Sequence, residues 1–97
     1  MRKIVINASY GGFYLSDEAK KWLLDHGKTE TDIRNYRNSY KSRDDELLVK
    51  CVEELGYEKA SGKYSKIKIV EVPLEVDFVI EDYDGGEWVA EKHRTWS

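Results

Sequence analysis

Histidine, cysteine and proline are scarce in this chain, and these scarcities exclude several classes of protein. The 97 residues include two histidines, one cysteine and one proline. The lone Cys51 has no partner for an internal disulfide, which excludes a disulfide-stabilised fold, and its place in an apolar helical pattern predicts a buried thiol. Two histidines and one cysteine make no cluster at zinc-ligand spacing, so we expect no metal and no cofactor.

Long apolar runs are also missing. The run that begins at Ile4 stops at Asn7, too soon for a signal-peptide core, and no stretch approaches the length of a membrane span. We therefore expect a cytosolic protein without a membrane partner. A net charge of −3, from 16 basic and 19 acidic residues, gives no overall attraction to nucleic acid. Nucleic acid is therefore not an expected partner unless a local basic patch exists.

What the chain does have is material for one core beneath a charged surface. Hydrophobic residues make up 40% of the chain and charged residues 36%, with three Trp, seven Tyr and two Phe. This composition is typical of a folded chain rather than a disordered one. At this length we expect a single domain over residues 1–97.

Apolar residues recur at helical spacing in two stretches. Ser16 is a good N-cap for a first helix over residues 17–26. A capping-box pattern over residues 42–45 precedes a second helix, predicted over residues 43–55. Between them, residues 32–40 fit either a short surface helix or a long loop. Residues 57–65 are predicted to be a connection without helix.

Strands are predicted at residues 3–7, 66–72, 75–81 and 87–91. The first is a continuous β-branched run, which favours a central strand that is covered on both faces. The Asp84-Gly85 pair predicts a hairpin turn, and the last three strands are predicted to form an antiparallel meander. The order β-α-α-β-β-β predicts an α+β fold with a largely antiparallel sheet and two helices on one face. The first strand must join this sheet to satisfy its backbone groups.

Signatures of catalysis are incomplete. The sequence contains no Gly-x-Ser-x-Gly elbow, Walker A motif or dinucleotide fingerprint. Neighbouring acids such as Asp44-Asp45 and Asp82/Asp84 are typical of a helix cap and a turn. The sequence therefore favours a binding protein over an enzyme.

The junction between the first strand and the first helix is the leading candidate site. The backbone amides of Gly11 and Gly12, with the helix start at Ser16, could hold an anion. The rings of Tyr10 and Phe13 could stack on a base beside it. The alternative is a tight turn that needs the conformational freedom of glycine.

The C-terminal residues are a second part of this candidate site. Arg94 could form a bidentate contact with a phosphate, while His93 donates a hydrogen bond and Trp96 stacks. The alternative is a last strand that Trp96 pins into the core or into a subunit interface. This aromatic end makes a homo-oligomer a further expectation.

A basic, tyrosine-containing segment over residues 28–43 carries five cations and two acids. Because Tyr and Arg often anchor protein interfaces, this segment is the candidate for contact with a protein partner. The alternative is a solvated face. The candidate contact residues are Arg34, Tyr36, Arg37, Tyr40 and Arg43.

Several motifs carry a resemblance to a known group of sequences. They are Lys3-Ile4-Val5-Ile6-Asn7, Tyr10-Gly11-Gly12-Phe13, Leu15-Ser16, Arg43-Asp44-Asp45, Tyr83-Asp84-Gly85 and Glu91-Lys92-His93-Arg94-Thr95-Trp96. With these motifs the chain resembles, nearly end to end, a family of small uncharacterised proteins from bacteriophages, prophages and their bacterial hosts. The resemblance brings no catalytic residues. It implies a protein in the host cytosol that binds a host protein or a small molecule used as a signal by host immunity.

Three hypotheses follow from these observations. The leading one is a non-enzymatic phage-type protein that binds an anionic, nucleotide-derived ligand and thereby blunts host defence. The second is an inhibitor that binds a host protein through residues 31–43. The third, the least favoured, is a small nucleotide hydrolase with Asp44 or His93 as its base.

Overall fold

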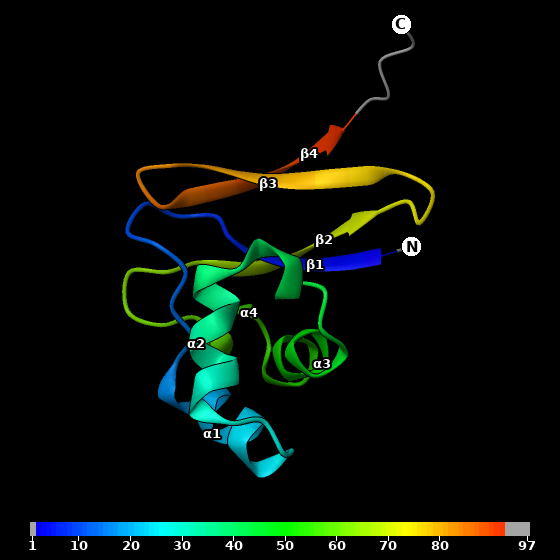
Figure 1. Cartoon of the computed structure of the whole chain (residues 1–97). Helices are drawn as coiled ribbons and strands as arrows, with labels where there is room; N and C mark the ends of the chain where they lie inside the picture. The colour runs from blue at the N-terminus through cyan, green and yellow to red at the C-terminus, as the bar shows by residue number, and fades with distance from the viewer. Residues whose placement is uncertain (1, 93–97) are drawn as a thin grey trace, which may run out of the picture.

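The computed structural model describes residues 2–92, which form stacked layers (Figure 1). A ribbon of β1 (Arg2–Asn7) and β2 (Ile67–Val72) is the middle layer. A hairpin of β3 (Asp77–Tyr83) and β4 (Gly86–Lys92) lies on one side of the ribbon, and the helices lie on the other. The predicted α+β class is confirmed, as is the placement of the helices on one face.

The strand pairing differs from the predicted meander. β2 runs antiparallel to β1, with Asn7 opposite Ile67, while β3 and β4 form a separate two-stranded sheet. A turn in which Val76 N donates to Pro73 O, at 3.2 Å, carries the chain from the ribbon to the hairpin. The single meander is therefore wrong, because β2 takes the distant β1 as its partner rather than the strand that follows it.

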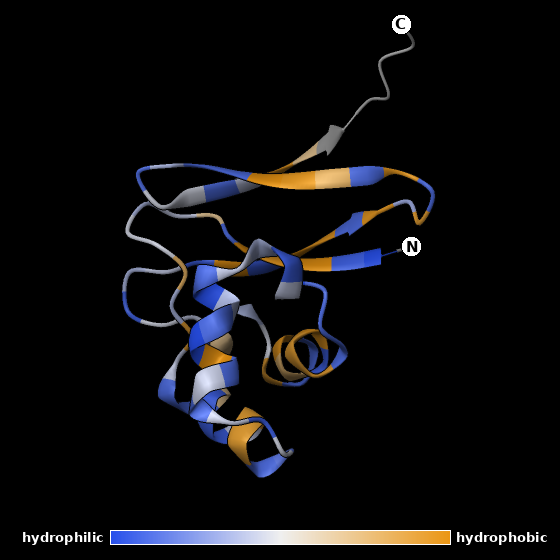
Figure 2. Cartoon of the chain, in the orientation of Figure 1, coloured by the Kyte–Doolittle hydropathy of each residue, from blue (hydrophilic) through white to orange (hydrophobic). Residues whose placement is uncertain are grey.

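β1 is buried on both faces, as its continuous apolar run predicts. Ile4 and Ile6 pack with Val72 and Ile80 in a cluster between the ribbon and the hairpin. Val5 points the other way, into a larger cluster formed with the helices. Figure 2 shows this apolar stretch of the ribbon between the two outer layers. Burying each such aliphatic side chain contributes roughly 1.5–3 kcal/mol to folding.

Helix formation between residues 17 and 38 follows from local capping. α1 (Asp17–Asp25) begins after Ser16, close to its predicted bounds. The undecided polar segment is a helix, α2 (Glu30–Asn38). It begins with a capping box in which Thr29 and Asp32 each accept a backbone hydrogen bond from the other, at 3.1 and 3.0 Å.

The third helix, α3 (Glu46–Leu55), begins later than predicted. Its N-cap is Asp45, whose carboxylate accepts from Leu48 N at 3.1 Å, and the residues before it form a 3₁₀ turn, η1 (Tyr40–Ser42). A helix start at residue 43 is therefore wrong. A short helix, α4 (Tyr57–Ala60), also interrupts the predicted connection. Among the described residues, no helix has both the length and the apolar character required to cross a membrane.

The hairpin turn forms where the sequence predicts it. Asp84 and Gly85 have φ values of 51° and 87°, so both central residues are left-handed, as a type I′ turn requires. This turn brings the end of the hairpin back against the loop between β1 and α1.

Candidate functional site

Arg43 lies fully buried where the layers meet. Its guanidinium donates to both carboxylate oxygens of Glu87, at 2.7 and 2.8 Å, and to the carbonyl oxygen of Val5 at 3.2 Å. Its Nε donates to the carbonyl oxygen of Tyr36, and its Cζ lies 3.7 Å from the centroid of the Phe13 ring. These contacts satisfy the charge of the Arg43 guanidinium and cover its planar face inside the molecule.

This burial corrects the predicted protein-contact segment. Arg43 is 0% exposed and Tyr36 is 2% exposed, so neither side chain can reach a partner. The Tyr36 hydroxyl donates to Asp45 at 2.8 Å, and burial together with this hydrogen bond raises the pKa of Tyr36. Arg34 and Arg37 remain exposed on α2, as does Tyr40 beyond it.

The Gly11–Gly12 turn does not form an open anion cradle. Gly11 N donates to the carbonyl oxygen of Asp84 at 3.0 Å. A Cβ placed on Gly85 would collide with Gly12 N and lie 2.8 Å from Gly11 N. The hairpin turn therefore fills the space before these amides. The φ values of 111° and 103° at the two glycines support the alternative, a tight turn that needs glycine.

The start of α1 is covered in the same way. The Ser16 hydroxyl accepts from Ala19 N at 3.1 Å and donates to the carbonyl oxygen of Lys59. Ser16 N donates to Ala60 O at 2.9 Å. The segment around α4 thus occupies the position that an anion would take at this helix end.

The remaining residues of the first candidate site are separated. Tyr10 is 70% exposed, but Phe13 is 4% exposed and one face of its ring lies beneath the Arg43 guanidinium, so that face is not open to a base. His93, Arg94 and Trp96 lie outside the described residues. The predicted grouping of these side chains around Gly11–Gly12 stays a prediction where the C-terminal residues are concerned.

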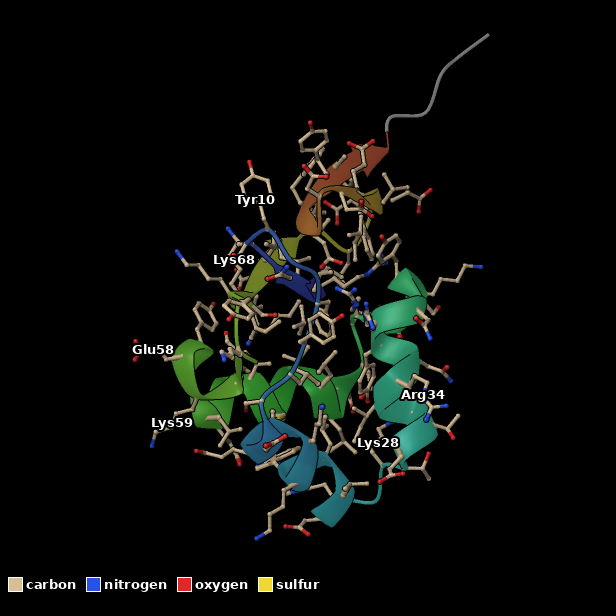
Figure 3. The ribbon with its side chains drawn as sticks, turned by 90° about the vertical axis from the view of Figure 1, so that its left-hand side faces the viewer. Tyr10, Lys28, Arg34, Glu58, Lys59 and Lys68 are labelled. Atoms are coloured by element: carbon tan, nitrogen blue, oxygen red, sulfur yellow. The ribbon has the colours of Figure 1, made fainter. Side chains whose placement is uncertain are left out.

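A cleft of 320 Å³ opens between α1, α2 and the loop that precedes α1. Figure 3 faces this side of the molecule, with α2 and Arg34 standing beside that loop. The buried Phe13 and Leu15, with the half-buried Ile33, give the cleft an apolar floor. The full lining consists of Phe13, Tyr14, Leu15, Lys20, Leu24, Glu30, Ile33, Arg34 and Arg37.

Positive charge predominates around this cleft. Lys20, Arg34 and Arg37 line it against one acid, Glu30. The Arg37 Cζ lies 4.3 Å from the centroid of the Tyr14 ring, which orders the guanidinium over the ring in a cation–π contact. The cleft thus combines apolar contact area, a planar stacking surface and cations, which together suit an anionic ligand with a planar part.

Sequence reasoning found part of this cleft and missed the rest. It singled out Phe13 as a ligand contact and Arg34 and Arg37 as a protein-contact surface, and it did not single out Lys20 or Leu24. Leu24 is 43% exposed because it lies off the buried face of α1. An apolar residue at an off-face position of an amphipathic helix is the signal that could have indicated the cleft.

Comparisons with known proteins identify no relative. The chain matches no known protein family, no curated protein and no solved structure. Among the side chains that the structure describes, no group of three or more from His, Cys, Asp or Glu is arranged to hold a metal ion.

Proposed function

We propose that this chain is a non-enzymatic binding protein whose cleft between α1 and α2 takes a small anionic ligand with a planar group, such as a nucleotide. The observation that carries the proposal is that three cations and one acid surround the apolar floor of the cleft. A volume of 320 Å³ lies at the lower end of the range for small-molecule sites. The cleft therefore suits a mononucleotide-sized ligand better than a larger one.

The roles of the side chains follow from their chemistry. Arg34 and Lys20 would contact the anionic group, since a guanidinium can bind phosphate through two parallel hydrogen bonds. Arg37, ordered on the Tyr14 ring, would offer its other face to a planar group. Leu24 and Ile33 would cover the apolar edge of the ligand.

The biological role in this proposal comes from the resemblance to phage and prophage proteins. A chain of this kind would act in the cytosol of a host cell, where it would sequester a nucleotide-derived immune signal. Binding without turnover is sufficient for that role. A nucleotide that is converted to a product would instead favour the hydrolase hypothesis.

Isothermal titration calorimetry tests the proposal with a panel of nucleoside monophosphates, diphosphates and cyclic nucleotides. We expect at least one of them to bind, and the double variant R34Q/R37Q to weaken that binding by at least tenfold, because each charged hydrogen bond contributes about 1.5–3 kcal/mol. The control is K50Q, an exposed lysine of α3 that does not line the cleft. No heat across the panel, or equal effects of the two substitutions, would refute the proposal.

A protein partner remains the second candidate, because Arg34 and Arg37 are also exposed members of the predicted protein-contact segment. The two candidate functions differ in whether Tyr40 takes part in binding. It is 39% exposed and does not line the cleft. Capture of a protein from host lysate that depends on Tyr40 as well as on Arg34, with no nucleotide binding, would favour the inhibitor hypothesis.

A further inference from the structure

A second basic surface lies on the segment from α4 to the start of β2, away from the cleft. Residues 57–68 contain four lysines and one acid, Glu58, so the segment carries a charge of +3 in a chain whose net charge is −3. All four lysines are exposed. They are Lys59, Lys63, Lys66 and Lys68.

Exposed tyrosine rings accompany these lysines. Tyr57 is 50% exposed and Tyr64 is 76% exposed, although both belong to the same short segment. The Lys63 Nζ lies 5.3 Å from the centroid of the Tyr64 ring. Solvated faces are usually built from charged and small polar residues, so rings this exposed among lysines indicate a contact surface.

The geometry places both kinds of side chain around one hollow. Tyr57, Lys66 and Lys68 all line a hollow of 530 Å³, whose floor includes the buried Ile67. Ala8 belongs to this hollow and also to a neighbouring one of 460 Å³. That second hollow is lined by Tyr10, Tyr83 and Trp88 among others.

The two hollows adjoin at Ala8: lysines and the acid Glu58 line the first, and aromatic rings with Glu87 line the second. We give the name lysine–tyrosine band to the exposed cations and rings of the first hollow and its segment, together with Tyr10 of the second hollow. Its defining residues are Tyr10, Tyr57, Lys59, Lys63, Tyr64, Lys66 and Lys68. In Figure 3, Tyr10, Lys68 and Lys59 lie along one side of the molecule, and Arg34 lies on the other. The band shares no residue with the cleft between α1 and α2.

We propose that the lysine–tyrosine band binds single-stranded nucleic acid. Four exposed ammonium groups on one short segment can neutralise the phosphates of a phosphodiester backbone, and exposed tyrosine rings stack on unpaired bases of any sequence. A double helix would keep its bases away from these rings. The acids Glu81, Asp82 and Asp84 belong to the hairpin, whose turn contacts the loop of Tyr10 through the bond from Gly11 N to Asp84 O. The phosphates therefore run over the lysines, and only bases approach the hairpin.

This inference is independent of the proposed function and revises the expectation that nucleic acid is not a partner. That expectation depended on the net charge of the whole chain and allowed for a local basic patch. Residues 28–43 and 57–68 each carry a charge of +3, but Arg43 is buried and Lys28 pairs with Asp45, whereas all four lysines of residues 57–68 are exposed.

Fluorescence anisotropy of the full chain with labelled oligo-U and oligo-dT of about ten nucleotides tests the proposal over about 50 to 200 mM salt. If all four lysines contact phosphates, the slope of log K against log salt concentration is about −2.8. The double variant K66Q/K68Q should reduce the magnitude of that slope by about 1.4. The matched control, K21Q/K50Q, removes the same charge from exposed positions on α1 and α3 and should leave the slope unchanged.

The tyrosine component has its own test. Y57A should weaken binding about tenfold, because stacking on one base is lost, and Y57F should restore it. Circular dichroism confirms that each variant is folded. The proposal is overturned if neither oligonucleotide binds at about 50 mM salt, or if K66Q/K68Q and K21Q/K50Q weaken binding equally. Binding to anionic lipid vesicles without binding to either oligonucleotide would also overturn it.

Discussion

Arg43 and Glu87 form a bidentate ion pair between residues 44 positions apart in the sequence. Their side chains are 0% and 6% exposed, so both charges are removed from water. The same Glu87 carboxylate accepts from Asn7 N at 2.8 Å, and Val5 N donates to Arg43 O at 2.9 Å. One ion pair thus ties the helical layer, the ribbon and the hairpin together.

Removing one partner of this pair should be strongly destabilising. We expect E87Q to lower the free energy of unfolding by about 3–5 kcal/mol, because the Arg43 charge is left buried without a counter-ion. E87D, which keeps the negative charge, should lower the free energy of unfolding by less than E87Q does. In contrast, E53Q breaks the exposed Lys3–Glu53 pair and should leave the free energy almost unchanged. Urea unfolding followed by circular dichroism compares the three, and equal losses for E87Q and E53Q would contradict the role of the buried pair.

The close approach of the hairpin turn to the Gly11–Gly12 loop predicts a second effect. G85A should destabilise the protein through its positive φ, which costs roughly 1–2 kcal/mol, and through the collision of the new Cβ with Gly12 N, which costs about 1–3 kcal/mol more. G27A is the matched control, since Gly27 has a φ of 96° and a Cβ added there would meet no atom within 4 Å. Thermal unfolding should give a lower melting temperature for G85A than for G27A. Equal melting temperatures would show that the turn tolerates a side chain.

Asp45 predicts a dependence of stability on pH. Burial alone would raise its pKa, but hydrogen bonds from Tyr36, from Leu48 N and from Lys28 outweigh burial and hold the pKa of Asp45 below its usual value. Its contribution to stability is therefore present above the ordinary Asp pKa and is lost as pH falls through the lowered one. The stability difference between wild type and D45N should shrink between about pH 5 and pH 2.

The control for this measurement is D44N, at an exposed neighbouring position that takes no part in the cap. Urea unfolding of each variant at a series of pH values gives the comparison. A difference between wild type and D45N that stays constant on acidification would contradict the proposed ionisation.

Cys51 should be unreactive in the folded protein. Burial raises the pKa of its thiol to about 11, and its side chain is 0% exposed. Since the thiolate is the reactive form, a thiol reagent at about pH 8 should modify Cys51 only after unfolding. Reaction with Ellman's reagent, with and without urea, measures this, and rapid modification of the native chain would contradict the buried position.

The parts of the fold that local chemistry determines could be predicted from the sequence. The Ser16 cap and the Asp84-Gly85 turn each depend on residues close in sequence, and both formed as predicted. The buried Cys51 was also predicted from helical spacing. In each case the sequence pattern that allowed the prediction spans only a few residues.

The parts that depend on distant residues could not be predicted. Arg43 was predicted to contact a protein partner and Glu87 was not singled out, because only the folded chain brings the two side chains together. The prediction placed β2 in a local meander with the strands that follow it, because its pairing with β1 also joins segments far apart in the sequence. The Gly11–Gly12 pair was interpreted as part of a ligand site. In the structure the conformational freedom of these glycines instead allows the distant Gly85 to pack closely against them.

The late position of Glu87 has a consequence for biosynthesis. During synthesis Arg43 is added to the chain 44 residues before its counter-ion Glu87. Asn7, whose backbone amide donates to the same carboxylate, is added 80 residues before it. Until the hairpin is synthesised, no Glu87 carboxylate is present to neutralise Arg43, so we expect the helical layer to reach its final packing only after the hairpin has formed. A product that terminates before Glu87 should therefore be less stable than the full chain and more open to proteolysis.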